Sequence, residues 1–90
     1  MENRLIPFGD FNDVKVGDEV VLHTWKTTNN GTEHHFYRDK VISVGDITFV
    51  IGGRDYTFSK SNGNIHRLDW VNCNVFPMEI VEKYGIDLEN

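Results

Sequence analysis

Four histidines are the side chains of this sequence best suited to bind a metal ion. They are His23, His34, His35 and His66, and imidazole is the commonest ligand of transition metals in proteins. Because neighbouring residues of a strand point to opposite faces, His34 and His35 cannot bind one ion together. A site would need one of them, His23 or His66, and a carboxylate such as Glu33. The sequence has no ligand-spacing motif, so we expect hydrogen-bonded or solvated histidines, no metal and no other cofactor.

The stretch "FSKSNGN" contains a Lys-Ser pair of the kind that ends a phosphate-binding loop. That loop requires glycine directly before the lysine and a helix after the serine, because the phosphates bind amides at the start of the helix. Here Phe58 and Ser59 precede Lys60, and a predicted strand follows. We therefore interpret residues 60–63 as a hairpin turn.

Nucleophilic and acid–base catalysis find little support in the sequence. Cys73 lies in "VNCNVF" without a neighbouring base, and no Gly-x-Ser-x-Gly motif is present. Nothing singles out two of the fourteen acidic residues as a catalytic pair. We expect Cys73 to be a small, partly buried side chain and the protein not to be an enzyme.

Charge is unevenly distributed over the 90 residues, whose net charge is −5. Residues 1–19 carry five acids and two bases, residues 71–90 carry four acids and one base, and the middle is nearly neutral. This balance opposes binding to nucleic acid over most of the surface. The single cysteine, the lack of a long apolar run and the lack of an export signal predict a cytoplasmic protein without a membrane contact.

Short apolar runs between glycine turns predict a single domain built mainly of β-strands. We expect strands at residues 19–25, 34–44, 47–51, 55–59 and 64–70. Ile47, Phe49 and Ile51 alternate onto one face, and Tyr56 and Phe58 are expected to point inward. Within residues 34–44 the apolar residues occupy both faces, which predicts a bulge where the sheet curls into a barrel.

Two other segments connect or follow these strands. The polar residues 27–32 predict a longer and more mobile loop than a two-residue hairpin. The end of the chain predicts a helix over about 77–85, starting at Pro77 and ended by Gly85 in the left-handed conformation. Ile80, Val81 and Tyr84 form its apolar stripe, and a helix this short must dock on the barrel, which covers about 14–72.

The segments "DVKVGDEVVL" and "DKVISVGDITFVIGGRDYTFSKSNGNIH" resemble a family of small SH3-like β-barrel proteins from bacteriophage and bacterial genomes. The resemblance covers roughly residues 11–70 and comprises a Val-Gly-Asp entry, a hairpin and an aromatic strand that ends in Phe-x-Lys-Ser-x-Gly. It implies a five-stranded antiparallel SH3-like barrel in a phage accessory protein of unknown role. No catalytic residue is carried over, because such barrels serve as generic platforms.

These observations favour a protein that binds another protein of the host or the phage and that acts in the host cytoplasm as an inhibitor of a host or defence protein. The candidate partner-binding residues are acidic and aromatic: Glu79, Glu82, Asp87, Glu89, Trp25 and Tyr37. The alternative is a nucleic-acid-binding barrel that combines aromatic platforms with basic residues: Lys26, Arg38, Lys40, Lys60 and Arg67. The sequence leaves the partner and the oligomeric state open.

Overall fold

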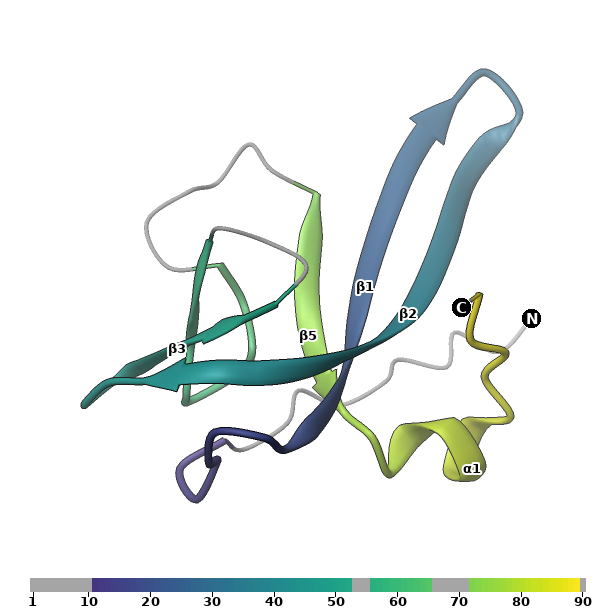
Figure 1. Cartoon of the computed structure of the whole chain (residues 1–90). Coiled ribbons are helices and arrows are strands. Elements are labelled where there is room, and N and C mark those ends of the chain that lie inside the picture. Colours follow the sequence, from purple (N-terminus) through teal and green to yellow (C-terminus); the bar gives the residue numbers. More distant parts are fainter. Residues whose placement is uncertain (1–10, 53–55, 66–71, 90) are drawn as a thin grey trace.

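The computed structural model describes residues 11–52, 56–65 and 72–89 and is mainly β (Figure 1). These residues form five antiparallel strands and one short helix: β1 (Glu19–Thr28), β2 (Gly31–Val44), β3 (Thr48–Ile51), β4 (Thr57–Ser59), β5 (Cys73–Pro77) and α1 (Ile80–Tyr84). The strand order in the sheet is β4-β3-β2-β1-β5. The long strands β1 and β2 thus lie at the centre of the sheet. β1 continues past the end of its pairing with β5, and β2 continues past the end of its pairing with β3.

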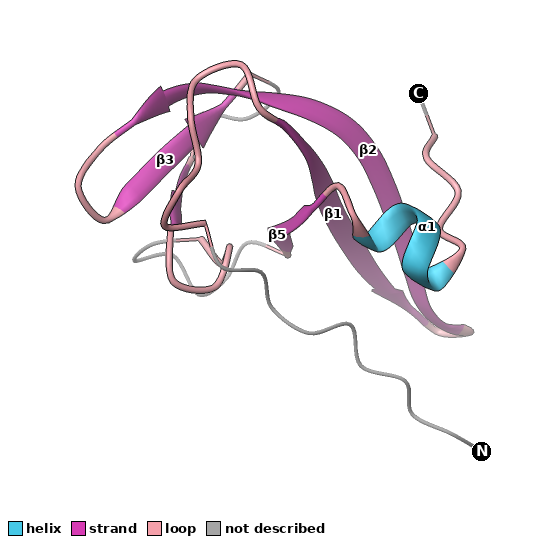
Figure 2. Cartoon of the chain, turned by 90° about the horizontal axis from the view of Figure 1, so that it is seen from below, coloured by secondary structure: helices cyan, strands magenta, loops and turns pink. Residues whose placement is uncertain are grey.

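The sheet curls into a half-barrel because β2 takes part in two pairings (Figure 2). Residues Gly31 to Lys40 pair with β1, whereas Val41 to Val44 pair with β3. The register shifts between Val41 and Ser43, and such an irregularity bends a strand and increases its twist. The predicted bulge is therefore confirmed.

The bend at residues 60–63 helps to close the half-barrel. Gly63 has a φ of +78°, and its carbonyl accepts a hydrogen bond from the Val75 N–H at 2.8 Å. A Cβ atom at this position would lie 2.1 Å from the Val75 oxygen and 2.8 Å from the Phe11 ring. Next to it, Asn64 and Ile65 form single bridges to Asn74 and Phe58. The bend thus packs against the body of the protein as a structural turn.

Two apolar clusters cover the two faces of the sheet. The inner cluster fills the half-barrel: Phe11, Val20, Leu22, Val41, Phe49, Ile51, Phe58, Cys73 and Val75. The outer cluster joins Val21 and Phe76 to the first residue of α1, Ile80, with Val81, Tyr84 and Ile86 packed around them. Gly85 ends α1 with a φ of 64°, so the predicted cap and apolar stripe are confirmed.

Two predictions about the strands need correction, and a third falls largely outside the described residues. Of the strand predicted at residues 64–70, Asn64 and Ile65 form single bridges and residues 66–70 lie outside the described residues, whereas "CNVFP", which was not predicted as a strand, forms β5. Ile47 does not share the buried face of Phe49 and Ile51, because it precedes β3 and is 66% exposed. Residues 27–32 do not form a long loop, since β1 and β2 stay paired as far as Thr28 and Gly31.

The helix is also shorter than expected. Pro77 is the last residue of β5 and not the first of a helix, because its strand continues the pairing with Val20. The helix begins at Ile80, with Glu79 as its N-cap. Of the predicted hairpin between 47–51 and 55–59, Gly53 and Asp55 lie outside the described residues, and the pairing of β3 with β4 is observed.

Candidate functional site

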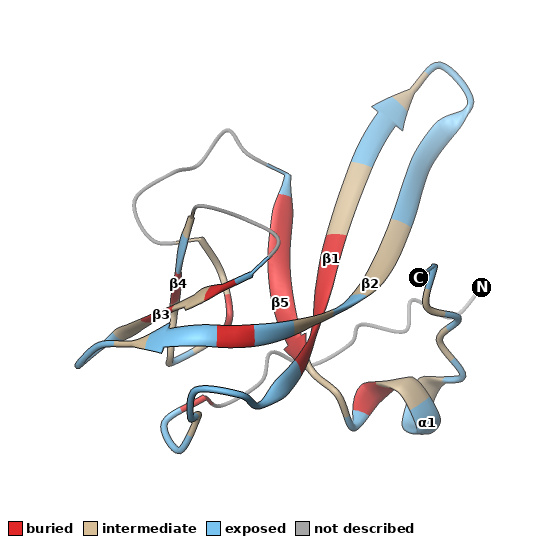
Figure 3. Ribbon diagram, in the orientation of Figure 1, coloured by how far each residue is buried: buried red, intermediate tan, exposed pale blue. Residues whose placement is uncertain are grey.

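The β1–β2 ladder extends well beyond the rest of the sheet. β5 pairs with β1 only as far as Thr24, whereas β1 and β2 continue together to the pair Thr28–Gly31. We call residues 25–34 the arm, and Figure 1 shows it projecting away from the half-barrel. Of its ten residues only Trp25 and Thr28 are even partly buried, as the burial colours of Figure 3 show.

The arm is polar and ends in a tight turn. The Thr28 hydroxyl donates to the Gly31 carbonyl at 3.0 Å and accepts from the Asn30 N–H at 3.2 Å. Across the ladder, Lys26 pairs with Glu33, and Thr27 pairs with Thr32. Short polar side chains can fix a turn of this kind, but they supply no apolar face to anchor the arm to a core. The arm is therefore held by its backbone ladder.

Along the arm, one edge of β2 has no neighbouring strand in the part of the chain that the structure describes. Successive residues of a strand point their backbone groups to opposite sides. The backbone of Val41 bonds to Gly17 and Asp18 on the β1 side, whereas the Phe36 carbonyl accepts a hydrogen bond on the opposite side. Odd-numbered residues of β2 therefore face β1, and even-numbered ones face away from it. Thr32 and His34 thus direct their N–H and C=O groups away from β1. Among the described residues no strand pairs there. We call this the outer edge of β2.

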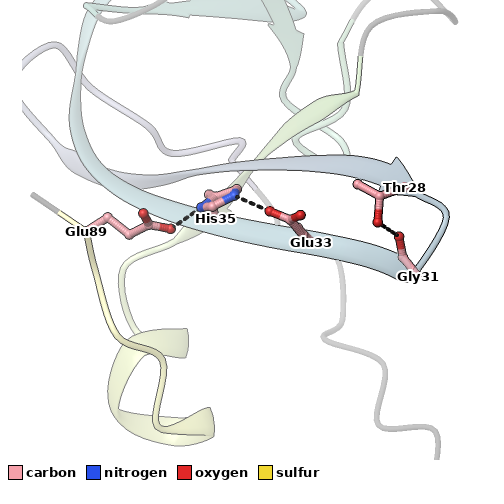
Figure 4. A network of polar contacts seen from close by, with 5 residues as sticks. All are labelled: Thr28, Gly31, Glu33, His35 and Glu89. Atoms are coloured by element: carbon pink, nitrogen blue, oxygen red, sulfur yellow. Dashed lines mark hydrogen bonds and ion pairs between the residues drawn. The ribbon is translucent and has the colours of Figure 1, made fainter.

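The C-terminal segment, residues 86–89, contacts the outer edge of β2 through Glu89, at the end of the edge nearest the half-barrel (Figure 4). The Glu89 N–H donates to the Phe36 carbonyl at 2.8 Å. The Glu89 carboxylate lies 2.5 Å from Nδ1 of His35, and the Glu33 carboxylate lies 3.8 Å from Nε2 of the same ring. The contact therefore combines a main-chain hydrogen bond on the edge with a carboxylate on His35.

A second polar group lies on the outer face at the base of the arm. Nδ1 of His23 contacts the Asn74 Oδ1 at 2.8 Å, and its Nε2 contacts Nδ1 of His34 at 2.9 Å. His23 stacks on Phe36 with ring centroids 4.6 Å apart and lies 5.0 Å from Trp25. Burial lowers the pKa of His23 below 6.5, the neighbouring His34 lowers it further, and the bond to Asn74 partly opposes the shift. Burial therefore favours the neutral form of the His23 ring.

The predicted partner-binding residues do not form one surface. Glu79 and Glu82 line a groove of about 380 Å³ together with Arg38, Met78 and Val81. Asp87 and Glu89 are exposed on the C-terminal segment. Trp25 lies on the outer face beside His23, whereas Tyr37 packs against the inner cluster, on the opposite face of the sheet. Glu79 and Glu82 thus lie beside Arg38, Glu89 lies beside His35, and the two aromatic residues lie on opposite faces of the sheet.

The basic residues are scattered as well. Arg38 is paired with Glu19, its Nη1 lying 3.2 Å from the carboxylate. Lys26 and Arg38 project from opposite faces, because Lys26 shares the face of Leu22 and Arg38 shares that of Phe36. Lys40 is exposed at the far end of the β1–β2 ladder, Lys60 lies in the bend beside Asp46, and Arg67 lies outside the described residues. The described residues do not bring these bases onto one face.

Sequence reasoning grouped His23 with His34 or His35 only within a metal hypothesis and missed Asn74. The described residues contain no group of three or more His, Cys, Asp and Glu side chains placed to hold a metal ion, and His66 lies outside them. Asn74 was missed because β5 was not predicted. The only signal for this strand was a polar residue, Asn74, between the apolar residues Cys73 and Val75.

Comparison of the chain with protein-family models, with curated proteins and with solved structures gave no match. In the part of the chain that the structure describes, no helix has the length and apolar character needed to cross a membrane.

Proposed function

We propose that this protein is a non-enzymatic protein-binding module that captures an extended segment of a partner by strand addition along the outer edge of β2. The observation that carries the proposal is the arm, a two-stranded ribbon whose outer edge has no neighbouring strand among the described residues. An unpaired strand edge presents a row of donors and acceptors that template another strand. The arm supplies such a row on a projecting part of the molecule.

The physical properties of the arm favour this mode over recognition by an apolar surface. An isolated two-stranded ribbon is at best marginally stable in water, and the side chains of the arm are mostly exposed and polar. An added strand would give the ribbon a third strand and would gain main-chain hydrogen bonds. The contact of the chain's own Glu89 with the Phe36 carbonyl gives an example of the bond such a segment would make.

Exposed acidic residues in the C-terminal part of the chain support a role in partner choice. Glu79, Glu82 and Asp87 are exposed, and Glu79 and Glu82 line a groove with Arg38 of β2. Charges at the rim of an interface change association rates and partner selection more than affinity. We propose that the partner has a basic surface around the captured segment. An SH3-like family identity, a phage origin and inhibition of a host or defence protein remain predictions based on the resemblance and on this charge.

Two threonines on the arm allow a matched test of strand addition. Thr27 and Thr32 are cross-strand partners, but the N–H of Thr32 points to the outer edge of β2 and that of Thr27 points to the opposite edge. Proline removes the donor and is tolerated at strand edges. We would select extended peptides from a random display library and measure their binding to both variants. Thr32→Pro should abolish binding, and Thr27→Pro should retain it.

Equal binding by the two proline variants would contradict strand addition at this edge. A separate titration with labelled single- and double-stranded DNA and RNA tests the alternative function. Phosphate contacts give an affinity that falls steeply with added salt. Strong, salt-sensitive binding of nucleic acid would favour the alternative, and weak binding at low salt would favour the protein-binding module.

A further inference from the structure

The C-terminal segment, residues 86–89, lies where a captured strand would have to continue. The backbone of Phe36 faces away from β1, as do those of Thr32 and His34, so the outer edge of β2 continues from the arm to Phe36. Bonding positions on one edge of a strand recur at every second residue. A partner segment that pairs with Thr32 and His34 therefore reaches Phe36 next, and the Phe36 carbonyl already accepts the Glu89 N–H at 2.8 Å.

The side chains of this segment alternate as in a half-buried strand. Its sequence, Ile-Asp-Leu-Glu, places apolar and acidic residues in turn, and the apolar residues are partly buried whereas the acidic ones are exposed. Ile86 and Leu88 pack against the outer cluster, as Phe36 does. Alternation of this kind is typical of a strand with one face on a core. The segment thus takes, at one residue of the edge, the place that a captured strand would take.

The side chain of Glu89 adds a second contact with β2. Its carboxylate lies 2.5 Å from Nδ1 of His35, and the Glu33 carboxylate lies 3.8 Å from Nε2 of the same ring (Figure 4). An N–H on Nδ1 of His35 can donate to the Glu89 carboxylate. Both side chains are exposed, and exposed pairs of this kind contribute little to stability. The segment is therefore held by contacts that are individually weak and that a competing strand can replace.

We propose that residues 86–89 are an autoinhibitory segment that competes with the partner for the outer edge of β2. In the closed state Glu89 occupies the edge at Phe36, and the partner pairs only with the arm, at Thr32 and His34. Release of the segment extends the edge to Phe36. The apparent affinity for a partner that uses all three positions is the intrinsic affinity reduced by the fraction of molecules that are open. This inference rests on the proposed function, because it requires a partner strand on the same edge.

Two acidic residues of the segment provide matched variants for the test. Glu89→Gln and Asp87→Asn each remove one negative charge from exposed positions, but the first removes the carboxylate that contacts His35. Glu89→Pro also removes the N–H that bonds to Phe36. Changes at such exposed positions should leave the fold intact. The probes would be extended peptides from the random display library, long enough to pair as far as Phe36, whose binding is lost in Thr32→Pro.

We expect Glu89→Pro to raise the affinity for these peptides by about fivefold, the effect of removing one neutral hydrogen bond from the closed state. Glu89→Gln should raise the affinity by about twofold, because the exposed pair with His35 is weak, and Asp87→Asn should leave it unchanged. In the original protein, a bound peptide should make the Glu89 amide exchange faster, as measured by NMR, because its acceptor at Phe36 has been taken by the peptide.

Two kinds of failure can be told apart. Peptides that require Thr32 but bind Glu89→Pro and the original protein with equal affinity would overturn the autoinhibition and leave strand addition intact. An equal gain in Glu89→Gln and Asp87→Asn would also overturn it, because net charge and not the contact with His35 would then set the affinity. If no peptide from the library requires Thr32, strand addition itself is wrong, and this inference is wrong with it.

Discussion

The half-barrel and the arm are made from the same two strands but are held together differently. Residues Val20 to His23 of β1 are all buried, whereas β1 is largely exposed from Lys26 onward. The ladder to β2 is unbroken throughout. What changes is the packing on the two faces of the ladder: β5, α1 and the inner cluster pack against the half-barrel and not against the arm. A continuous ladder therefore joins a region fixed by side-chain packing to one fixed by backbone pairing.

The largest expected effect contrasts a core residue with a residue of the arm. Phe58 is completely buried in the half-barrel and faces Phe49, with ring centroids 6.0 Å apart. Phe58→Ala should lower the free energy of unfolding by about 4 kcal/mol, because it leaves a cavity. Thr32→Ala on the arm should change it by less than about 0.5 kcal/mol. Urea denaturation measures both, and similar losses would show that the arm contributes to the folding core.

Two glycines with positive φ sharpen the same contrast. Gly63→Ala places a Cβ atom 2.1 Å from the Val75 carbonyl oxygen, and a backbone atom cannot move aside. We expect it to lower the free energy of unfolding by at least about 3 kcal/mol, from overpacking and backbone strain together. Gly31→Ala, at the tip of the arm, meets nothing within 4 Å and should cost about 1 kcal/mol from its φ alone. Equal costs, measured by denaturation, would contradict the packing at Gly63.

A third prediction concerns the pH dependence of stability at the junction of the two regions. The pKa of His23 is lower in the folded protein than its ordinary value of 6.5, so the unfolded chain binds more protons as the pH falls below that value. Stability should therefore decrease from roughly pH 7 to pH 5. His23→Gln should reduce this slope in denaturation experiments at several pH values. An unchanged slope would show that other groups are responsible for it.

The smallest effect is expected for the C-terminal segment. Glu89 and His35 have side chains that are 41% and 37% exposed, and exposed ion pairs contribute little to stability. A double-mutant cycle of Glu89→Gln and His35→Gln should give a coupling energy of about 0.5 kcal/mol or less. A coupling above about 2 kcal/mol would mean that this segment belongs to the folded core.

Local signals in the sequence were sufficient for several features of the fold. Apolar residues on both faces of 34–44 predicted the bulge, and Gly85 marked the end of α1, because each depends on residues close together in the chain. The tight turn of the arm was missed because polar residues 27–32 resemble a loop until their pairing is known. These residues belong to β-strands because their backbones pair across the ladder, which their composition does not indicate.

The candidate site was harder to predict because its contacts are distant in sequence. "CNVFP" contains a polar residue and a proline, both unusual in a buried strand. Asn74 is nevertheless buried, because His23, 51 residues earlier, satisfies its side chain. The outer edge of β2 likewise depends on β3, which pairs with β2 only from Val41 onward and does not reach Thr32 and His34. No local pattern encodes either arrangement.

Amide hydrogen exchange, measured by NMR with and without a selected peptide, tests most directly whether the outer edge of β2 captures an extended segment. In the free protein the amides of Thr32 and His34 should exchange quickly, whereas those of Glu33 and His35, which face β1, should be slower. The bound peptide should protect Thr32 and His34 and leave Thr27 unchanged. Protection of Thr27 instead, or unchanged exchange at Thr32 and His34 in a saturated complex, would contradict strand addition at this edge.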